Sequence, residues 1–408
     1  MTNNSCPNIK TFIVNVLSGN AIFRTLKVCR AKFIFNSFLC FAAVKGKINF
    51  LQMQRFSQKS EQYFRIGFEN KFNFQDFNLD MIKEKVSRSE CVIAFDPSYI
   101  PKSGKKTYGP GLYWSGCAGA KKRGLEICGF AAVDAINSTA FHLNAIQTPM
   151  SKDFHLTQYY CRIIRENHLY FKELSDCLVA DSFFAKAEVV ETVTDLGMHP
   201  VSRLRDDAAL HYLNREPKTE KRGAPKKYAG KVITAQPDMN YFKLILNTSE
   251  IKVYNAIVYY KAFKRNINLS ITVFYDKNGN EKARKLYFST DLRMDGLKVV
   301  SSCRSRFQIE FLYRDARQHC GLEDCQARSK NKLHFHFNAA LTAVNLAKLH
   351  WLQTRKSEHT PFSMANFKTL THNTVLLNRF FDVFAINPNN PKNQRKIKEL
   401  INYGLIAA

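Results

Sequence analysis

Two short apolar runs along the chain each stop at an aspartate. Val92 to Phe95 leads into Asp96 and Pro97 follows at once, so the pattern predicts a buried strand whose last residue is Asp96. Leu178 to Ala180 leads into Asp181 in the same way. Both carboxylates are therefore expected at strand ends, where they can meet in space.

The segments around these runs predict a mixed α/β core. After Asp181, Ser182 is a candidate helix cap, Gly197 is a candidate helix stop, and His199 to Arg205 follows as a short strand. Upstream, a meander of three strands with basic turns at Lys121 to Arg123 and elsewhere leads into helices. These elements are strands Cys91–Phe95, Leu125–Val133 and Ala140–Gln147, a helix over Phe154–Asn167 and another near Tyr170. This order is expected of a ribonuclease H-like mixed sheet flanked by helices.

The rest of the chain divides into helical ends and an all-β insertion. Residues 1–88 and the stretch from Lys332 onward have apolar residues at helical spacing, whereas residues 232–300 read as strands with a hairpin turn at Asn278-Gly279. A basic linker from Asn214 to Lys231, which includes Lys226 and Lys227, precedes these strands and is expected to lie along a duplex. The predicted segments are a helical DNA-binding or dimerisation module (1–88), the first part of the core (89–213), the linker and β insertion (214–300), the second part of the core (301–355) and a helical C-terminal region (356–408).

A third acid, Glu310, lies in a segment with unusual charge patterning. The sequence from about Arg304 to Cys320 predicts a helix with Ile309, Leu312, Tyr313, Ala316 and Cys320 on its apolar face. At about 100° per residue, four charged residues fall within an arc of about 80° beside that face: Arg306, Glu310, Arg314 and Arg317. One acid in a row of arginines is suited to a phosphate site, because the carboxylate holds a cation and the guanidinium groups grip phosphate oxygens. An ordinary i,i+4 ion pair between Arg306 and Glu310 is the simpler interpretation.

Charge identifies the class of partner. The chain has 61 Lys and Arg against 34 Asp and Glu, a formal net charge of +27, and the basic residues are spread over its length. Nucleic acid is the predicted partner, because neutralising phosphates releases counterions. An anionic membrane is the alternative, but the longest apolar segment, Phe33 to Val44, is about half of the ~20 residues that a span requires. The first apolar stretch, Phe12 to Leu17, is too short for a secretory signal. We therefore expect a cytoplasmic protein without a membrane partner.

The cysteines suggest a reduced protein. There are 11, an odd number without a paired framework, which argues against a disulfide scaffold. A zinc site is an alternative use of some of them, although no CxxC is present and the spacing fits no standard pattern. Its candidate ligands are His319, Cys320, Cys325, His334 and His336.

These contexts together resemble the DDE transposases of bacterial insertion sequences, in the branch like insertion sequence four. The resemblance extends from about Cys91 to Arg355 and rests on "IAFDPSYIPKSGKKTYG", "LVADSFF" and "SRFQIEFLYRDARQHCGLEDCQARS". In the family a Tyr-x2-Arg-x3-Glu-x6-Lys signature surrounds the catalytic Glu. Arg306 and Glu310 occupy the Arg and Glu positions, Arg317 stands where Lys is expected, and Cys303 replaces the Tyr. The missing hydroxyl and aromatic ring put any phosphate contact or base stacking at that position in doubt.

The resemblance implies an active site and its partners. Asp96, Asp181 and Glu310 would form the DDE triad and bind two Mg²⁺ or Mn²⁺ ions for cut-and-paste cleavage and strand transfer. The implied partners are double-stranded DNA, both terminal inverted repeats and target, and a second subunit in a synaptic homodimer. Arg306 and Arg317 would hold the phosphate near the cut, and tyrosines of the insertion could stack a displaced base. Further candidate DNA contacts are Arg314, Arg203, Arg205, Lys102, Lys105, Lys106, Lys226 and Lys227.

Two other functions compete with this one. One is a nuclease of the same fold that never joins strands, and the other is an inactive relic that binds DNA through its charge. Asp291, which follows the apolar run Leu286 to Thr290, is an alternative third acid. The expected setting is the bacterial cytoplasm, with the protein on the nucleoid when it is bound to DNA.

Overall fold

Five strands form the central sheet of the computed structural model, which describes residues 9–149, 155–215 and 227–406. β1 (Cys91–Pro101) pairs antiparallel with β3 (Ala120–Asp134), which in turn pairs antiparallel with β4 (Thr139–Gln147). On its other side β1 runs parallel to β5 (Cys177–Val179), which runs parallel to β6 (His199–Leu204). The resulting order β4-β3-β1-β5-β6 is the ribonuclease H-like mixed sheet that the sequence predicted.

β1 does not end at Asp96, which corrects the sequence-based prediction. It continues through Pro97 to Pro101 and is paired with β3 over its whole length. β5 pairs only with Ile93 and Ala94, so beyond these residues β1 has a hydrogen-bonded strand on one side only. Proline, which lacks an N–H, is tolerated on such an open edge.

The helices between the core strands differ in detail from the prediction. α7 (Leu156–Lys172) is one helix rather than two, because no Gly or Pro interrupts this stretch. Asp181 rather than Ser182 is the cap after β5: its Oδ1 accepts the backbone N–H of Phe183 at 2.9 Å, at the start of the short helix η3 (Ser182–Phe184). α8 (Ala187–Asp195) then runs toward Gly197, whose φ of 67° confirms the predicted helix stop.

The β insertion extends the central sheet instead of forming a separate one. β12 (Glu281–Ser289) pairs antiparallel with β6, and this joins the insertion to the core. The Asn278-Gly279 hairpin turn, with Gly279 at φ 78°, confirms the predicted link between β11 and β12. The other strands of the insertion are β7 (Leu210–Leu213), β8 (Tyr228–Lys231), β9 (Lys243–Asn247), β10 (Ile251–Tyr260) and β11 (Arg265–Tyr275). β8 takes up the end of the predicted linker, and residues 216–226, including Lys226, lie outside the described residues.

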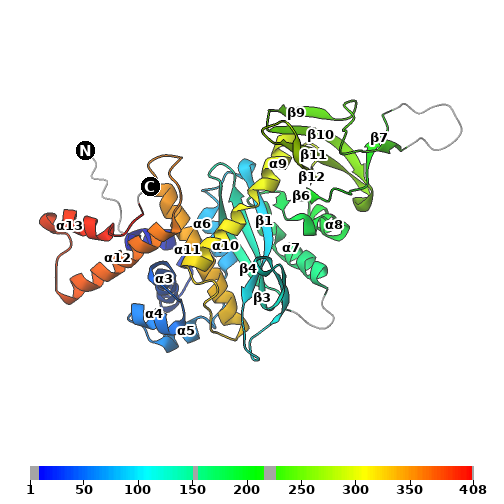
Figure 1. Ribbon diagram of the computed structural model, residues 1–408. Helices are drawn as coiled ribbons and strands as arrows, with labels where there is room; N and C mark the ends of the chain where they lie inside the picture. The colour runs from blue at the N-terminus through cyan, green and yellow to red at the C-terminus, as the bar shows by residue number, and fades with distance from the viewer. Residues whose placement is uncertain (1–8, 150–154, 216–226, 407–408) are drawn as a thin grey trace, which may run out of the picture.

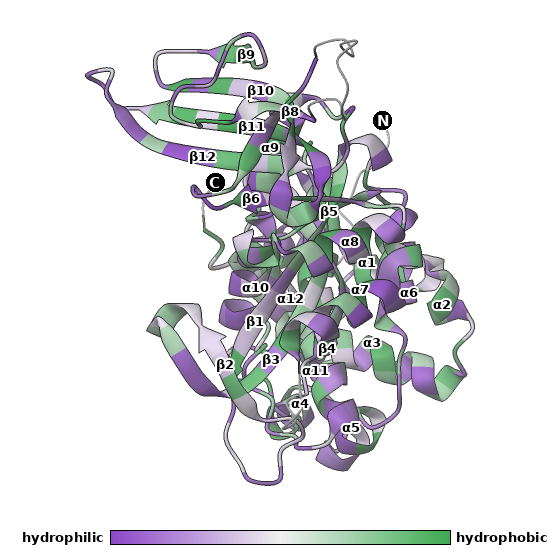
Figure 2. Cartoon of the chain, turned by 90° about the vertical axis from the view of Figure 1, so that its right-hand side faces the viewer, coloured by the Kyte–Doolittle hydropathy of each residue, from purple (hydrophilic) through white to green (hydrophobic). Residues whose placement is uncertain are grey.

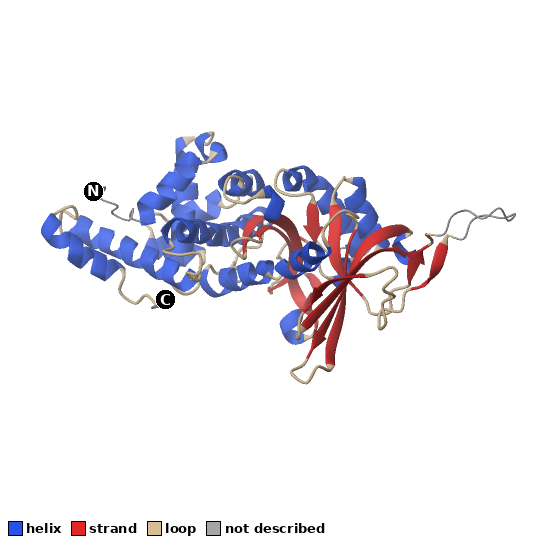
Figure 3. Ribbon diagram, turned by 90° about the horizontal axis from the view of Figure 1, so that it is seen from above, coloured by secondary structure: helices blue, strands red, loops and turns tan. Residues whose placement is uncertain are grey.

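Helices gather at one end of the molecule and the insertion lies at the other (Figures 1 and 3). The N-terminal helices are α1 (Ile9–Gly19), α2 (Ala21–Arg24), α3 (Val28–Ala43), α4 (Phe50–Phe56), α5 (Glu61–Gly67) and α6 (Phe74–Ile82). After the insertion come α9 (Gly296–Ser305), α10 (Gln308–His319), α11 (Lys330–Thr354), α12 (Met364–Val383) and α13 (Pro391–Ile401). One apolar core runs from the N-terminal helices through the central sheet to α11 and α12, where Phe68 lies 4.3 Å from Phe335 between ring centroids. Within the described residues, no helix is both long and apolar enough to cross a membrane.

The two faces of the central sheet carry different residues. On β1, Asp96 and Ser98 point to the face that α10 covers, since both contact arginines at the two ends of α10. Phe95 points to the opposite face, where it packs against Tyr160 of α7 and Phe184. We call the first of these the α10 face.

Candidate active site

Arg306 connects two of the three predicted acids. Its Nη1 donates to Asp96 Oδ1 at 3.0 Å and its Nη2 donates to Glu310 Oε1 at 2.8 Å. Asp96 lies on β1 and Glu310 on α10, so one guanidinium group joins the strand to the helix. The ion pair with Glu310 is therefore part of a three-residue cluster and not only the i,i+4 pair of a solvated helix face.

The position of Arg306 results from a break that the sequence did not predict. The expected single helix from Arg304 to Cys320 is two helices, α9 and α10, and Arg306 is the residue after α9. Val299 and Val300 of α9 belong to the face that packs toward the insertion, whereas Ile309 and Leu312 of α10 pack on the core. The break allows each half to follow its own surface, and it leaves the side chain of Arg306 turned toward Asp96 on β1.

Burial and charge set the ionisation of Asp96. Desolvation raises the pKa of Asp96 to about 7, Arg306 opposes the shift, and the nearby carboxylates of Asp181 and Glu310 add to it. The side chain of Asp96 is 19% exposed and that of Arg306 is 16% exposed, so the pair is poorly screened by water. A site with three carboxylates and one partly buried arginine holds surplus negative charge that a cation would offset.

Asp181 belongs to the same cluster by strand register. Ala94 of β1 pairs with Val179 of the parallel strand β5, and Asp96 and Asp181 each follow that pair by two residues in the same direction. Both carboxylates therefore lie at the same level along the sheet, just beyond the end of β5. Within the described residues, however, no three His, Cys, Asp or Glu side chains already lie close enough to hold a metal ion. This also applies to the alternative zinc ligands His319, Cys320, Cys325, His334 and His336, all of which are described.

Tyr313 and Arg317 fix the strand that carries Asp96. The Tyr313 hydroxyl donates to the carbonyl oxygen of Asp96 at 2.6 Å, and Arg317 Nη2 donates to Ser98 Oγ at 2.6 Å. Gly129 lies opposite Asp96 in the register, and a Cβ there would lie 2.0 Å from the Tyr313 hydroxyl. The apolar spacing predicted Tyr313 only as part of the apolar face of its helix. The one sequence signal for its role in the site is that Tyr313 places a hydroxyl in an otherwise apolar face, three residues after Glu310.

Gly129→Ala is expected to destabilise the protein by about 1–3 kcal/mol, because the added methyl group pushes Tyr313 away from β1. Denaturant unfolding measures this change. Gly116→Ala is the matched control, since a Cβ at Gly116 meets nothing within 4 Å. Equal unfolding free energies for the two variants would show that Tyr313 is not held against β1.

The other predicted DNA contacts occupy varied positions. Lys105 and Lys106 are exposed, as is Arg205, while Arg203 pairs with Asp206 at 3.5 Å. Arg314 is 55% exposed and pairs with Asp315. Lys102 is turned inward, where its ammonium donates to the carbonyl of Cys325. Lys227 lies over the rings of Tyr228 and Tyr259 in the insertion. Asp291, the alternative third acid, accepts the backbone N–H of Arg293 as a turn cap.

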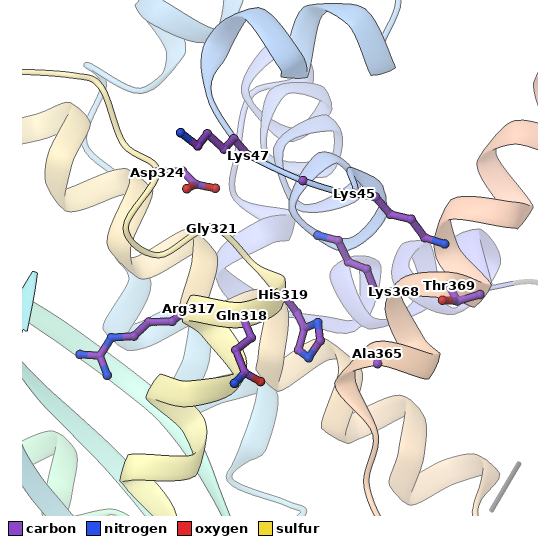
Figure 4. Close-up of a pocket in the computed structure, with 11 residues that line it drawn as sticks. Lys45, Lys47, Arg317, Gln318, His319, Gly321, Asp324, Ala365, Lys368 and Thr369 are labelled. Carbon is purple, nitrogen blue, oxygen red and sulfur yellow. The ribbon is translucent and has the colours of Figure 1, made fainter. Parts of the chain in front are cut away.

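Two basic pockets flank the cluster. A pocket of about 350 Å³ lies directly beside Arg306 and is lined by Lys285, Tyr287, Cys303, Arg304, Arg306 and Phe307. Another, of about 410 Å³, lies beyond the C-terminal end of α10, between Lys45 and Lys47 on one side and Lys368 on the other. Figure 4 shows that Arg317 points away from the lysines of this second pocket. Arg306 lines the first pocket and donates to both Asp96 and Glu310, so the pocket beside Arg306 is the one connected to the acids.

Comparison with known protein families places most of the core and the β insertion within a family model. The model of the family described as "Transposase DDE domain" matches residues 87–346, a range that contains all three acids and the β insertion. No curated protein matches the chain.

Proposed function

Because the chain belongs to the transposase DDE domain family, we propose that it is an insertion-sequence transposase that cuts DNA at the ends of its element and joins them to a target. The observation that carries the proposal is the bridge from Arg306 to Asp96 and Glu310. It brings together two carboxylates from the two ends of the family match, next to a basic pocket.

The acids suit divalent cations in their chemistry. Asp96, Asp181 and Glu310 offer hard oxygen ligands, which Mg²⁺ and Mn²⁺ prefer, and burial together with the two neighbouring carboxylates raises the pKa of Asp96, a cost that a bound cation would offset. Two such ions, when bound, would activate the attacking hydroxyl and offset charge on the leaving oxygen. We propose that the carboxylates converge when Arg306 exchanges Asp96 for a phosphate of the DNA.

The protein's own groups would then position the DNA. Arg306 offers a planar fork that matches phosphate oxygens, and its partial burial keeps that interaction strong. Tyr313 and Arg317 hold β1 still, so that Asp96 stays in line with the strand to be cut. Arg317 is bonded to Ser98 and Glu323. A direct contact of Arg317 with a DNA phosphate would be additional to its role in holding β1.

The pocket beside Arg306 would take the nucleotide next to the cut. Lys285 and Arg304 offer charge for a phosphate, and Tyr287 and Phe307 offer ring surface for a base. Phe307 is 51% exposed, so its ring is accessible to a base that enters the pocket. It lines the same pocket as Cys303, so it would offer there the aromatic ring that Cys303 lacks.

Several finer features belong to the same proposal. These are membership of the branch like insertion sequence four, a bacterial cytoplasmic setting, cut-and-paste chemistry and a synaptic homodimer. The predicted segment boundaries at residues 88, 213, 300 and 355 also stay proposals, with the N-terminal helices as the module that contacts DNA or a second subunit.

A strand-joining assay tests the proposed function. Full-length protein is incubated with Mg²⁺, a target plasmid and a labelled donor DNA that carries the coding region with its flanking sequences. We expect cleavage at the flanks and labelled joined product, both lost in EDTA. Cleavage without joined product would identify a nuclease instead, and DNA binding with neither product would identify an inactive relic.

A further inference from the structure

A two-stranded ribbon extends the central sheet beyond the body of the protein. β2 (Gly111–Ser115) pairs antiparallel with the first residues of β3, with Leu112 opposite Arg123 and Trp114 opposite Lys121. Lys121 to Arg123 were expected in a turn, and β2 was not predicted from the sequence. Figure 2 shows the ribbon standing clear of the neighbouring elements, below β1.

One face of the ribbon is anchored and the other is open. Tyr113 points to the anchored face, where it is buried and its hydroxyl donates to the carbonyl of Thr148 at 2.5 Å. Leu112 and Trp114 point to the open face and are 59% and 61% exposed. Directly paired residues share a face, so Lys121 and Arg123 lie on the open face too, while Lys122 lies on the face of Tyr113.

The open face of the ribbon continues the α10 face of the central sheet. Gly129, opposite Asp96, lies on the α10 face, and β3 has no register shift between Gly129 and Lys121 in its pairing with β1 and β2. Side chains alternate along a strand, so Arg123 and Lys121, six and eight residues from Gly129, lie on the same face as Asp96. At about 3.3 Å per residue, Lys121 and Trp114 are roughly 26 Å from the cluster, the length of about eight base pairs.

The charge around the ribbon has one sign. The chain has no Asp or Glu from residue 97 to residue 125, whereas this stretch holds six basic residues. They are Lys102, Lys105, Lys106, Lys121, Lys122 and Arg123. Apart from the inward-turned Lys102, all are exposed. An exposed tryptophan that shares its face with Lys121 and Arg123 complements a polyanion that also has flat apolar rings.

We propose that the open face of this ribbon, formed by Leu112, Trp114, Lys121 and Arg123, binds duplex DNA about eight base pairs from the cleavage point. Trp114 packs against or between bases, and Lys121 and Arg123 hold the adjoining phosphates. The assignment rests on the proposed function for its cleavage point. A protein partner would be expected to meet a larger apolar area than Leu112 and Trp114 provide.

Fluorescence of Trp114 tests the contact directly. The chain has only two tryptophans, so full-length Trp351→Phe reports on Trp114 alone. We expect quenching on titration with a blunt DNA duplex of about 30 base pairs, long enough to span cluster and ribbon. Heparin, which has charge but no bases, should quench much less. Equal quenching by heparin, or a response only to vesicles that contain phosphatidylserine, would overturn the proposal.

Substitutions on the two faces of the ribbon give a matched comparison. Trp114→Ala is expected to weaken duplex binding roughly 5- to 150-fold, and Trp114→Phe only a few-fold. Lys121→Ala should lower the slope of log affinity against log salt by about one, whereas Lys122→Ala, the neighbour on the opposite face, should leave it unchanged. Equal slopes for the two lysine variants would contradict the assignment of the open face.

Failure of this proposal can be told apart from failure of the proposed function. Mg²⁺-dependent cleavage is measured on the same preparations. Cleavage with an unresponsive Trp114 overturns the ribbon contact and leaves the transposase activity standing. A responsive Trp114 without cleavage supports the ribbon as a DNA-binding surface and overturns the activity.

Discussion

Asp96→Asn is expected to lower Mg²⁺-dependent DNA cleavage roughly a thousandfold, about 4 kcal/mol in activation free energy, while DNA affinity changes little. The amide keeps the shape of the side chain and its bond from Arg306, but it removes the charge that a divalent cation requires. Initial rates on labelled donor DNA measure the effect, and a gel shift without Mg²⁺ measures binding.

The same loss is expected for Asp181→Asn and Glu310→Gln, because the three carboxylates act as one ligand set. Asp291→Asn is the control, since Asp291 caps a turn and has no bond to the Arg306 cluster. If Asp291→Asn abolished cleavage while Glu310→Gln did not, the third acid would be misassigned. Unchanged cleavage in Asp96→Asn would remove the basis of the proposed function.

Local patterns predicted the core because they report local physics. The apolar run before Asp96 reflects a strand that is buried on both faces, and the apolar spacing around Glu310 reflects a helix that packs on the sheet. The ribonuclease H-like sheet was predicted from the order of these strands and helices along the chain. Asn278-Gly279 marked its hairpin because positive φ suits glycine.

The features of the fold that the local sequence patterns did not predict depend on long-range packing. β1 can continue through Pro97 because β5 pairs only with Ile93 and Ala94 and leaves that edge of β1 open. The helix breaks near Arg306 because α9 and α10 pack on different surfaces. The ribbon escaped prediction because the first four residues of β3 are all exposed, so Lys121 to Arg123 carry no alternating pattern. The bond from Tyr313 to the carbonyl of Asp96 joins residues too distant in sequence for any local signal.

Removing Arg306 is expected to have the second largest effect. Arg306→Ala leaves Asp96 and Glu310 without their shared partner, and breaking a partly buried pair of this kind costs on the order of 2 kcal/mol or more of folding stability. Thermal unfolding in EDTA measures the loss. Cleavage should fall about a hundredfold, because the fork that would grip the phosphate is gone. Arg306→Lys keeps the positive charge but lacks the planar guanidinium group, so relative to Arg306→Ala it should recover more of the folding stability than of the cleavage activity.

The change in unfolding temperature on addition of Mg²⁺ distinguishes a cation site around Arg306 from a purely structural role for Arg306. If the carboxylates bind cations, Mg²⁺ replaces the lost positive charge, and it should raise the unfolding temperature of Arg306→Ala more than that of the wild type. Arg314→Ala is the matched control, because Arg314 lies on α10 beside Glu310, is 55% exposed and pairs with Asp315 outside the cluster. It should respond to Mg²⁺ as the wild type does. Equal Mg²⁺ shifts in Arg306→Ala and the wild type would mean that Arg306 only fastens α10 to β1, and that the carboxylates around it do not form a cation site.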